Sequence, residues 1–191
     1  MSGIFGRRVF DQGARQIAGL GGGQFIKSIQ HATITTTGTT DTGTATISAV
    51  DTANSILYFD GASAGNTSGA TVSAFRVVLT NSTTVTATRN TSSAVVGTIK
   101  VTVVEYYPNV IRSIQSGSDN ITGGGFFYIT AVDTAKTLIL PLGYTSTTDS
   151  GWTWDNSRLY YYLSNSTTVI FTKDTANTSE WVVYFSVVEF Y

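Results

Sequence analysis

The sequence predicts an all-β protein made of two tandem antiparallel β-sandwich modules, or small barrels, preceded by an N-terminal arm. The composition is rich in Thr, Val, Ile, Tyr and Phe, which favour strands, and only 12% of the 191 residues are charged. Apolar and polar residues alternate with a period of two in several segments. Four phrases also occur twice, in the same order and at nearly constant spacing. Together these three observations indicate a duplicated β-structure.

The repeated phrases define the two modules, which we place at residues 25–107 and 110–191. The pairs are FIKSIQ and VIRSIQ, SAVDTA and TAVDTA, LTNSTTV and LSNSTTV, and VTVVEYY and FSVVEFY. Small differences in spacing correspond to loops of different length. The linker at 107–109 is short, so we expect the modules to pack against each other.

Period-two alternation marks about six candidate strands in each module. Three clear examples in the first module are residues 44–50, 83–89 and 98–106, where Ala, Val or Ile alternates mostly with Thr. One apolar and one polar face is the pattern of an antiparallel sheet with one side in water. The alternation therefore predicts a sheet face that packs in a core.

The repeated polar positions are predicted turns between strands. Asn81 and Asn165 fall where one strand ends and the next begins, and Asn tolerates the backbone of a tight turn. Asp51 and Asp133, in the AVDTA phrases, predict Asx-type turns in the same way. The alternative is a catalytic carboxylate in each module, but no partner acid or base lies nearby in the sequence.

The last strand of the second module, residues 181–190, is largely apolar on both faces, with Ser186 as the polar exception, unlike residues 98–106 of the first. Residues 158–163 are similar and contain three tyrosines in a row. A sheet that is apolar on both sides needs cover on both sides. One cover is the partner layer of its own sandwich, and the other is the first module or another subunit. We therefore expect the second module to lie nearer an interface.

The N-terminal arm, residues 1–24, lies outside the repeat and combines an apolar stripe with basic residues and a glycine-rich joint. Its apolar residues fall partly at helical spacing. The arm is either a segment that orders when it docks on a neighbouring protein or a disordered tail, with membrane contact as a third alternative. The candidate docking residues are Ile4, Phe5, Val9, Phe10 and Ile17.

The sequence shows no catalytic, cofactor-binding or metal-binding motif, and we expect no enzyme activity, cofactor or metal. Cysteine is absent, which excludes disulfides and thiolate chemistry. The single histidine, His31, lies in a predicted strand without an evident ligand or nucleophile partner. A net charge of −1 provides no basic stripe, so we expect no nucleic-acid partner. No apolar run reaches the length of a signal peptide or a membrane span, so we expect no membrane insertion.

The segment 143–156 is more aromatic than its counterpart in the first module. Trp152 and Trp154 are two residues apart and share a face in an extended segment. Such a pair stacks on a sugar, anchors a protein interface or packs in a core, and the sequence leaves all three open. The candidate contacts for a protein interface or a glycan are Trp152, Trp154, Tyr160, Tyr162 and Tyr184.

Taken together, the phrases IKSIQ, AVDTAK, LTNSTTV and the terminal VVEY and VVEF resemble small β-sandwich modules in structural proteins of tailed bacteriophages. The resemblance covers both repeats but not the arm, and it transfers no functional residue. It implies a virion component assembled in the bacterial host cytoplasm, either a capsid decoration protein or a tail or head–tail accessory protein. The implied partners are other virion proteins and further copies of the chain, which is expected to form a homo-oligomer. Docking would use the arm and the second module. The alternative is a carbohydrate-binding module for host adsorption that uses residues 143–156.

Overall fold

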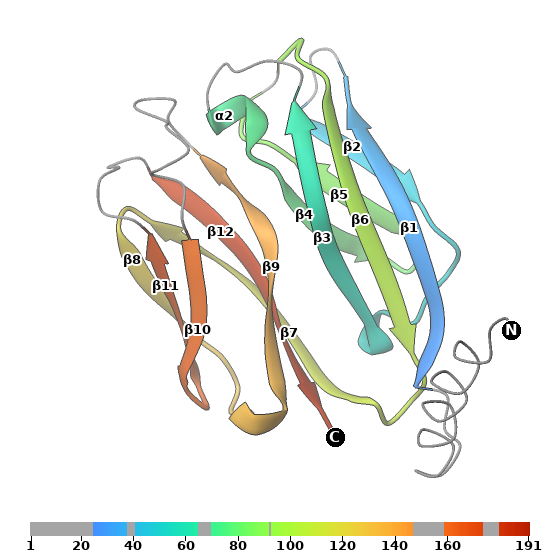
Figure 1. Cartoon of the computed structure of the whole chain (residues 1–191), viewed down its shortest axis with the longest axis vertical. Helices are drawn as coiled ribbons and strands as arrows, with labels where there is room; N and C mark the ends of the chain where they lie inside the picture. The colour runs from blue at the N-terminus through green and yellow to red at the C-terminus, as the bar shows by residue number, and fades with distance from the viewer. Residues whose placement is uncertain (1–24, 38–40, 65–69, 92, 147–158, 174–179) are drawn as a thin grey trace, which may run out of the picture.

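The computed structural model describes residues 25–37, 41–64, 70–91, 93–146, 159–173 and 180–191, and it is all-β (Figure 1). The two modules lie side by side, each with six strands within the described residues. The candidate arm residues and Trp152 and Trp154 lie outside the described residues. No helix in the described part of the chain is long and apolar enough to cross a membrane.

The strands follow the same order in both modules. Those of the first module are β1 (Ile26–Thr36), β2 (Thr42–Thr46), β3 (Ser55–Ala64), β4 (Arg76–Asn81), β5 (Thr84–Thr88) and β6 (Gly97–Tyr106). Those of the second are β7 (Ile111–Ile121), β8 (Gly124–Tyr128), β9 (Thr137–Ser146), β10 (Leu159–Asn165), β11 (Thr168–Lys173) and β12 (Trp181–Phe190). Short 3-10 turns precede β3 (η1, Thr52–Asn54) and β9 (η2, Thr134–Lys136), and the short helix α2 (Ala70–Ser73) precedes β4.

The strands pair antiparallel in three sheets, with the orders β1-β6-β3, β10-β11-β8 and β2-β5-β4-β9-β12-β7. The pairing recurs between the modules, because β1-β6-β3 corresponds to β7-β12-β9 and β2-β5-β4 corresponds to β8-β11-β10. Each module is therefore a sandwich of two three-stranded layers. One layer from each module joins edge to edge to form the six-stranded sheet. The predicted class, an antiparallel β-sandwich fold, is confirmed.

Each sandwich encloses its own core, as the period-two alternation predicts. In the first module Ile99, Val101 and Val103 of β6 point into the core, while Lys100 lies on the opposite face in water. The core of the second module is more aromatic and is built around Trp181 and other fully buried side chains. The remaining buried members of that core are Ile121, Val132, Val169, Phe171, Val183, Phe185 and Val187.

Strand β2 is shorter than the alternation at residues 44–50 predicts, and it ends at Thr46. Ile47 and Val50 are still buried in the core, but their backbones bond to the turn between β4 and β5. The Ile47 amide donates to the Thr83 carbonyl and the Val50 amide to the Ser82 carbonyl, both at 2.9 Å. The predicted strand is wrong beyond Thr46 because the chain leaves the sheet there while its apolar side chains still face the core.

The first module covers the outer face of the β7-β12-β9 layer. Val188 packs with Ile56 in a small apolar cluster between the modules. In the same cluster the rings of Tyr106 and Phe190 meet edge to face, with centroids 6.2 Å apart. Tyr184 packs against the core of the first module. The second apolar face of β12 is therefore covered within the chain, and the modules pack against each other.

Candidate functional site

The repeated LTNSTTV and LSNSTTV phrases form the predicted turns. The Asn81 side-chain oxygen accepts a hydrogen bond from the Thr83 amide at 2.9 Å, and Asn165 accepts one from Thr167 at 2.8 Å. Each turn joins two neighbouring strands of one layer and shifts their register by one residue. The repetition is therefore explained by turn chemistry.

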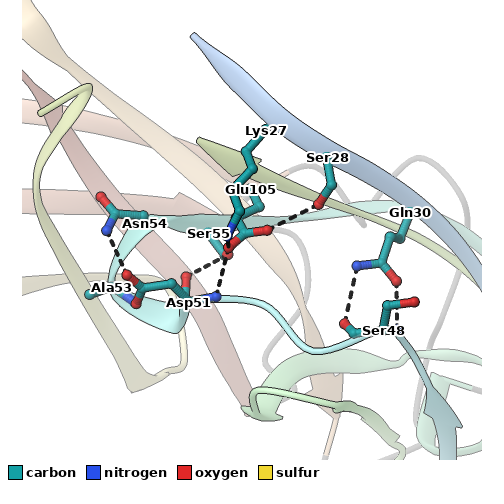
Figure 2. A network of polar contacts seen from close by, with 9 residues as sticks. All are labelled: Lys27, Ser28, Gln30, Ser48, Asp51, Ala53, Asn54, Ser55 and Glu105. Carbon is teal, nitrogen blue, oxygen red and sulfur yellow. Dashed lines mark hydrogen bonds and ion pairs between the residues drawn. The ribbon is translucent and has the colours of Figure 1, made fainter. Parts of the chain in front are cut away.

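A buried carboxylate fixes the AVDTA turn of the first module to the sheet (Figure 2). Glu105 of β6 is 3% exposed, and it accepts hydrogen bonds from Lys27 Nζ at 2.8 Å and Ser28 Oγ at 3.2 Å. It also accepts one from the Asp51 amide at 3.0 Å. The Asp51 side chain accepts from the Ala53 amide at 3.0 Å and so begins the 3-10 turn η1. Glu105 therefore holds strands β1 and β6 and the turn together.

The second module repeats this network with one exchange of cation. Glu189, also 3% exposed, accepts from Arg112 Nη1 at 3.2 Å and from the Asp133 amide at 2.8 Å. The Asp133 side chain accepts from the Ala135 amide at 3.0 Å, as Asp51 does from Ala53. The recurring aspartates are turn residues in both modules, and their role is structural.

In the first module, the hydrogen bonds of this network favour the charged forms of Glu105 and Asp51. Burial opposes ionisation of Glu105, but hydrogen bonds from Lys27, the Asp51 amide and Ser28 outweigh it and hold the pKa of Glu105 below its usual value of 4.5. Asn54 and the Ala53 amide lower the pKa of Asp51 in the same way. Both groups therefore act as hydrogen-bond acceptors at neutral pH and are poor proton donors.

We expect Glu105→Gln to lower the free energy of unfolding by about 2 kcal/mol at neutral pH, because an amide replaces an acceptor that serves three donors. The pKa of Glu105 is depressed in the folded state, so its ionisation adds stability above pH 4.5. That stability is lost as the pH falls below this value through the lower folded-state pKa. Between about pH 6 and pH 3, the free energy of unfolding measured with urea should therefore fall less in the variant than in the native protein. Parallel losses would contradict this role for Glu105.

His31 lies beside the Thr102 hydroxyl but does not accept its hydrogen. Its Nδ1 lies 2.8 Å from Thr102 Oγ1, and that hydroxyl donates to Asp60 Oδ2 at 2.6 Å. Because the hydroxyl hydrogen already points to Asp60, the imidazole Nδ1 must be the donor to Thr102. In the described residues, no group of three or more His, Asp or Glu side chains is placed to hold a metal ion.

A cavity of about 340 Å³ lies between the two modules. Its lining includes Leu57, Leu142, Tyr184 and the hydrogen-bonded pair Ser116 and Ser186, whose Oγ atoms are 2.6 Å apart. None of the described residues that line it is charged.

The outer face of the β10-β11-β8 layer carries the most exposed group of aromatic side chains in the described residues. The exposed fractions are 57% for Phe126, 70% for Tyr128, 55% for Tyr160 and 48% for Tyr162. The strand register places Tyr162, Ile170 and Phe126 in one row across the layer. The rings of Phe126 and Tyr128 contact each other with centroids 5.2 Å apart. We name these five residues, Phe126, Tyr128, Tyr160, Tyr162 and Ile170, the aromatic face.

The aromatic face is uncharged and large. The other outward positions of its described strands are Gly124, Ser164, Thr168 and Thr172. The four rings together expose on the order of 450 Å² of aromatic surface. A patch of this size equals the largest apolar patches on monomeric proteins, which are often functional. Its chemistry suits contact with an apolar or hydroxyl-rich surface.

The first module provides an internal comparison for this face. Its β2-β5-β4 layer has the same topology, but threonines fill most of the equivalent outward positions. The equivalent positions, with the first-module residue named first, are Thr44 and Phe126, Thr46 and Tyr128, Thr86 and Ile170, Val78 and Tyr162, and Arg76 and Tyr160. Because the same layer folds without the rings, the sandwich does not need them for its own packing.

Two of the sequence-predicted contact residues lie on the aromatic face, and these are Tyr160 and Tyr162. Tyr184 lies elsewhere, in the contact between the modules, where the Arg76 guanidinium stands 4.5 Å from its ring centroid. The other candidates, Trp152, Trp154 and the arm residues, lie outside the described residues. Phe126 and Tyr128 were not predicted, although the sequence contains the signal: FFY at 126–128 stands where the first module has TAT at 44–46.

Comparisons of the chain with protein-family models, with curated proteins and with solved structures found no match. The double sandwich and the aromatic face are therefore the features of the molecule that bear on its function.

Proposed function

We propose that this protein is a non-enzymatic binding component of a larger assembly and docks on it through the aromatic face of the second module. Four exposed rings stand where the equivalent layer of the same chain carries threonines or other smaller residues, and this observation carries the proposal. Following the resemblance of the repeats, the assembly is the virion of a tailed bacteriophage. The protein would be a capsid decoration protein or a tail or head–tail accessory protein, with the N-terminal arm as a second contact and the first module facing outward.

The chemistry of the face suggests how docking gains its energy. Covering on the order of 450 Å² of aromatic surface is favourable by about 25 cal/mol per Å² before the cost of association. The rings lie on a sheet, so little backbone order is lost when they bind. The face is uncharged, and salt screening acts only on charges. Docking should therefore persist at high ionic strength.

We expect the double variant Phe126→Thr/Tyr128→Thr, which gives β8 the residues of β2, to bind its assembly at least about tenfold more weakly, a loss of 1.4 kcal/mol or more. Its stability should change little, because both side chains are exposed. Co-sedimentation with particles, or with a capsid or tail protein, in high salt measures binding. The matched control is Thr44→Ser/Thr46→Ser in the first module. A folded double variant that co-sediments like the native protein would contradict the proposal.

Glycan binding is the second candidate, and the exposed rings of Tyr162 and Phe126 favour it, because sugar rings stack on exposed aromatic side chains. Titration calorimetry with soluble bacterial surface glycans tests it directly. Binding that the Phe126→Thr/Tyr128→Thr variant loses would place the glycan on the aromatic face. Binding that only Trp152→Ala abolishes would place it in the segment 143–156 instead. No heat with any glycan would contradict this second candidate.

A further inference from the structure

Strand β4 of the first module uses its open edge to join the second module. The Tyr144 amide of β9 donates to the Phe75 carbonyl, just before β4, at 3.2 Å, and Arg76 pairs with Gly143. This contact turns two three-stranded layers into one six-stranded sheet (Figure 1). Edge-to-edge extension of this layer is therefore already part of the fold.

Strand β10 occupies the place of β4 in the second module, but it pairs only with β11 in the described structure. Proteins commonly protect such an edge with charges, proline or a bulge in mid-strand. The β10 sequence, LYYYLSN, has no charged residue and no proline, and its register shift lies near its end, between Leu163 and Asn165. Tyrosine also favours strands. The edge is therefore well suited to pair with another strand.

We propose that β10 pairs antiparallel with β10 of a second copy of this chain. The resulting symmetric dimer contains a continuous sheet with the order β8-β11-β10-β10-β11-β8. The equivalent strand β4 already pairs edge to edge with β9, a strand of another sandwich layer, so strand addition at this edge has a precedent within the chain. A strand pairing with itself across a two-fold axis is the simplest self-complementary contact.

The chemistry of the edge supports a second copy over an unrelated partner. The described outward side chains beside the seam are uncharged, so two copies meet without like-charge repulsion. A highly charged partner would find no complementary charge there. A two-fold axis at Tyr161 places Tyr160 of each copy opposite Tyr162 of the other, on the same face of the sheet. Aromatic pairs in this cross-strand position stabilise antiparallel sheets.

The pairing leaves Phe126 and Tyr128 away from the seam, on β8 at the far edge of each copy's layer. The two aromatic faces would then form one broad surface on one side of the dimer. The proposal does not depend on what that surface binds. Failure of the dimer would leave docking intact, and failure of docking would leave the dimer intact.

Analytical ultracentrifugation of the full chain, alone in solution and over a wide concentration range, tests the proposal. We expect a monomer–dimer equilibrium. Tyr162→Lys should raise the dimer dissociation constant at least about tenfold, because two ammonium groups are brought together near the seam. The matched control, Thr44→Lys on the outward face of the edge strand β2, should leave the equilibrium unchanged. A native protein that stays monomeric, or a dimer that Tyr162→Lys leaves unchanged, overturns the proposal.

Amide hydrogen exchange of the native chain provides a test that needs no variant. Pairing protects the backbone amides on the open edge of β10. Their exchange should therefore be slow at protein concentrations above the dimer dissociation constant and faster after dilution below it. The amides of the edge strand β2 should exchange at the same rate at both concentrations. Exchange of β10 that does not depend on concentration, in a sample that ultracentrifugation shows to be dimeric, would place the interface elsewhere and overturn the pairing.

Discussion

Replacing Arg89 by methionine is expected to lower the free energy of unfolding by about 3 kcal/mol. Arg89 directly follows β5 and is fully buried. Its guanidinium donates to the Val95 carbonyl at 2.8 Å and to the Ser93 carbonyl at 2.6 Å. Methionine fills much of the same space but donates nothing, so both carbonyls lose a charged donor. Urea unfolding at neutral pH, followed by tryptophan fluorescence, measures the loss.

The outcome decides between two opposing effects of a buried cation. Burial destabilises the charged guanidinium and lowers the pKa of Arg89, although the nearby Asp41 acts in the opposite direction. Replacing a buried charge by an apolar group sometimes stabilises a protein, because the cost of desolvation disappears. We expect the hydrogen bonds to dominate, since they hold the segment 93–95 against the core. A methionine variant as stable as the native protein would show that desolvation dominates.

Arg76 provides the control for this substitution. Its guanidinium stands over the ring of Tyr184 at a half-buried site, with 4.5 Å to the ring centroid. Cation–π contacts in such places contribute about 0.5–1 kcal/mol. Arg76→Met should therefore cost clearly less than Arg89→Met. Similar losses would mean that the carbonyl bonds of Arg89 contribute little.

Features that depend on local sequence could be predicted from the chain alone. The turns at Asn81 and Asn165 follow from side chains that bond amides two residues away. The turns at Asp51 and Asp133 have the same cause. The inward positions of β6 follow from alternation along one strand. In each case the determining contact lies within a few residues or within one strand.

Features that depend on distant contacts could not be predicted. The role of Glu105 requires Lys27 and Ser28, more than seventy residues earlier in the chain. The sequence does contain one signal for this role. A glutamate follows two valines in the last strand of both modules, as Glu105 and as Glu189. Burial of Arg89 has no such signal, because the TTVTATR pattern alone places an arginine at a strand end, normally in water.

The aromatic face was only partly predictable for a similar reason. Residues 126–128 are aromatic on both sides of β8, so no alternation separates inside from outside. The register shows that Phe127 packs in the core, whereas Phe126 and Tyr128 face solvent. Alignment of the two repeats would have found the exchange, because Thr44 and Thr46 mark the outward positions. The joining of layers through β4 and β9 required the three-dimensional structure, since it depends on a contact between modules.

Gly143→Ala is expected to show how much the contact between β4 and β9 contributes to the free energy of unfolding. Gly143 has a φ of +92°, and a Cβ there would lie 2.0 Å from the Phe75 carbonyl oxygen. The substitution therefore adds backbone strain and forces β4 away from β9, which breaks the Tyr144–Phe75 hydrogen bond. We expect a loss of at least about 3 kcal/mol in the free energy of unfolding.

Gly61 is the matched control, because it occupies the equivalent position of the first module and has a φ of +137°. A Cβ at Gly61 meets no described atom within 4 Å. Gly61→Ala should therefore lower the free energy of unfolding by backbone strain alone, without a steric clash, which is about 1–3 kcal/mol. The difference between the two alanine variants then measures the β4–β9 contact. If the junction couples the modules, urea unfolding of Gly143→Ala should separate into two transitions while Gly61→Ala keeps one. Equal losses with one transition in both variants would show that the apolar cluster around Val188 joins the modules without help from the strand edge.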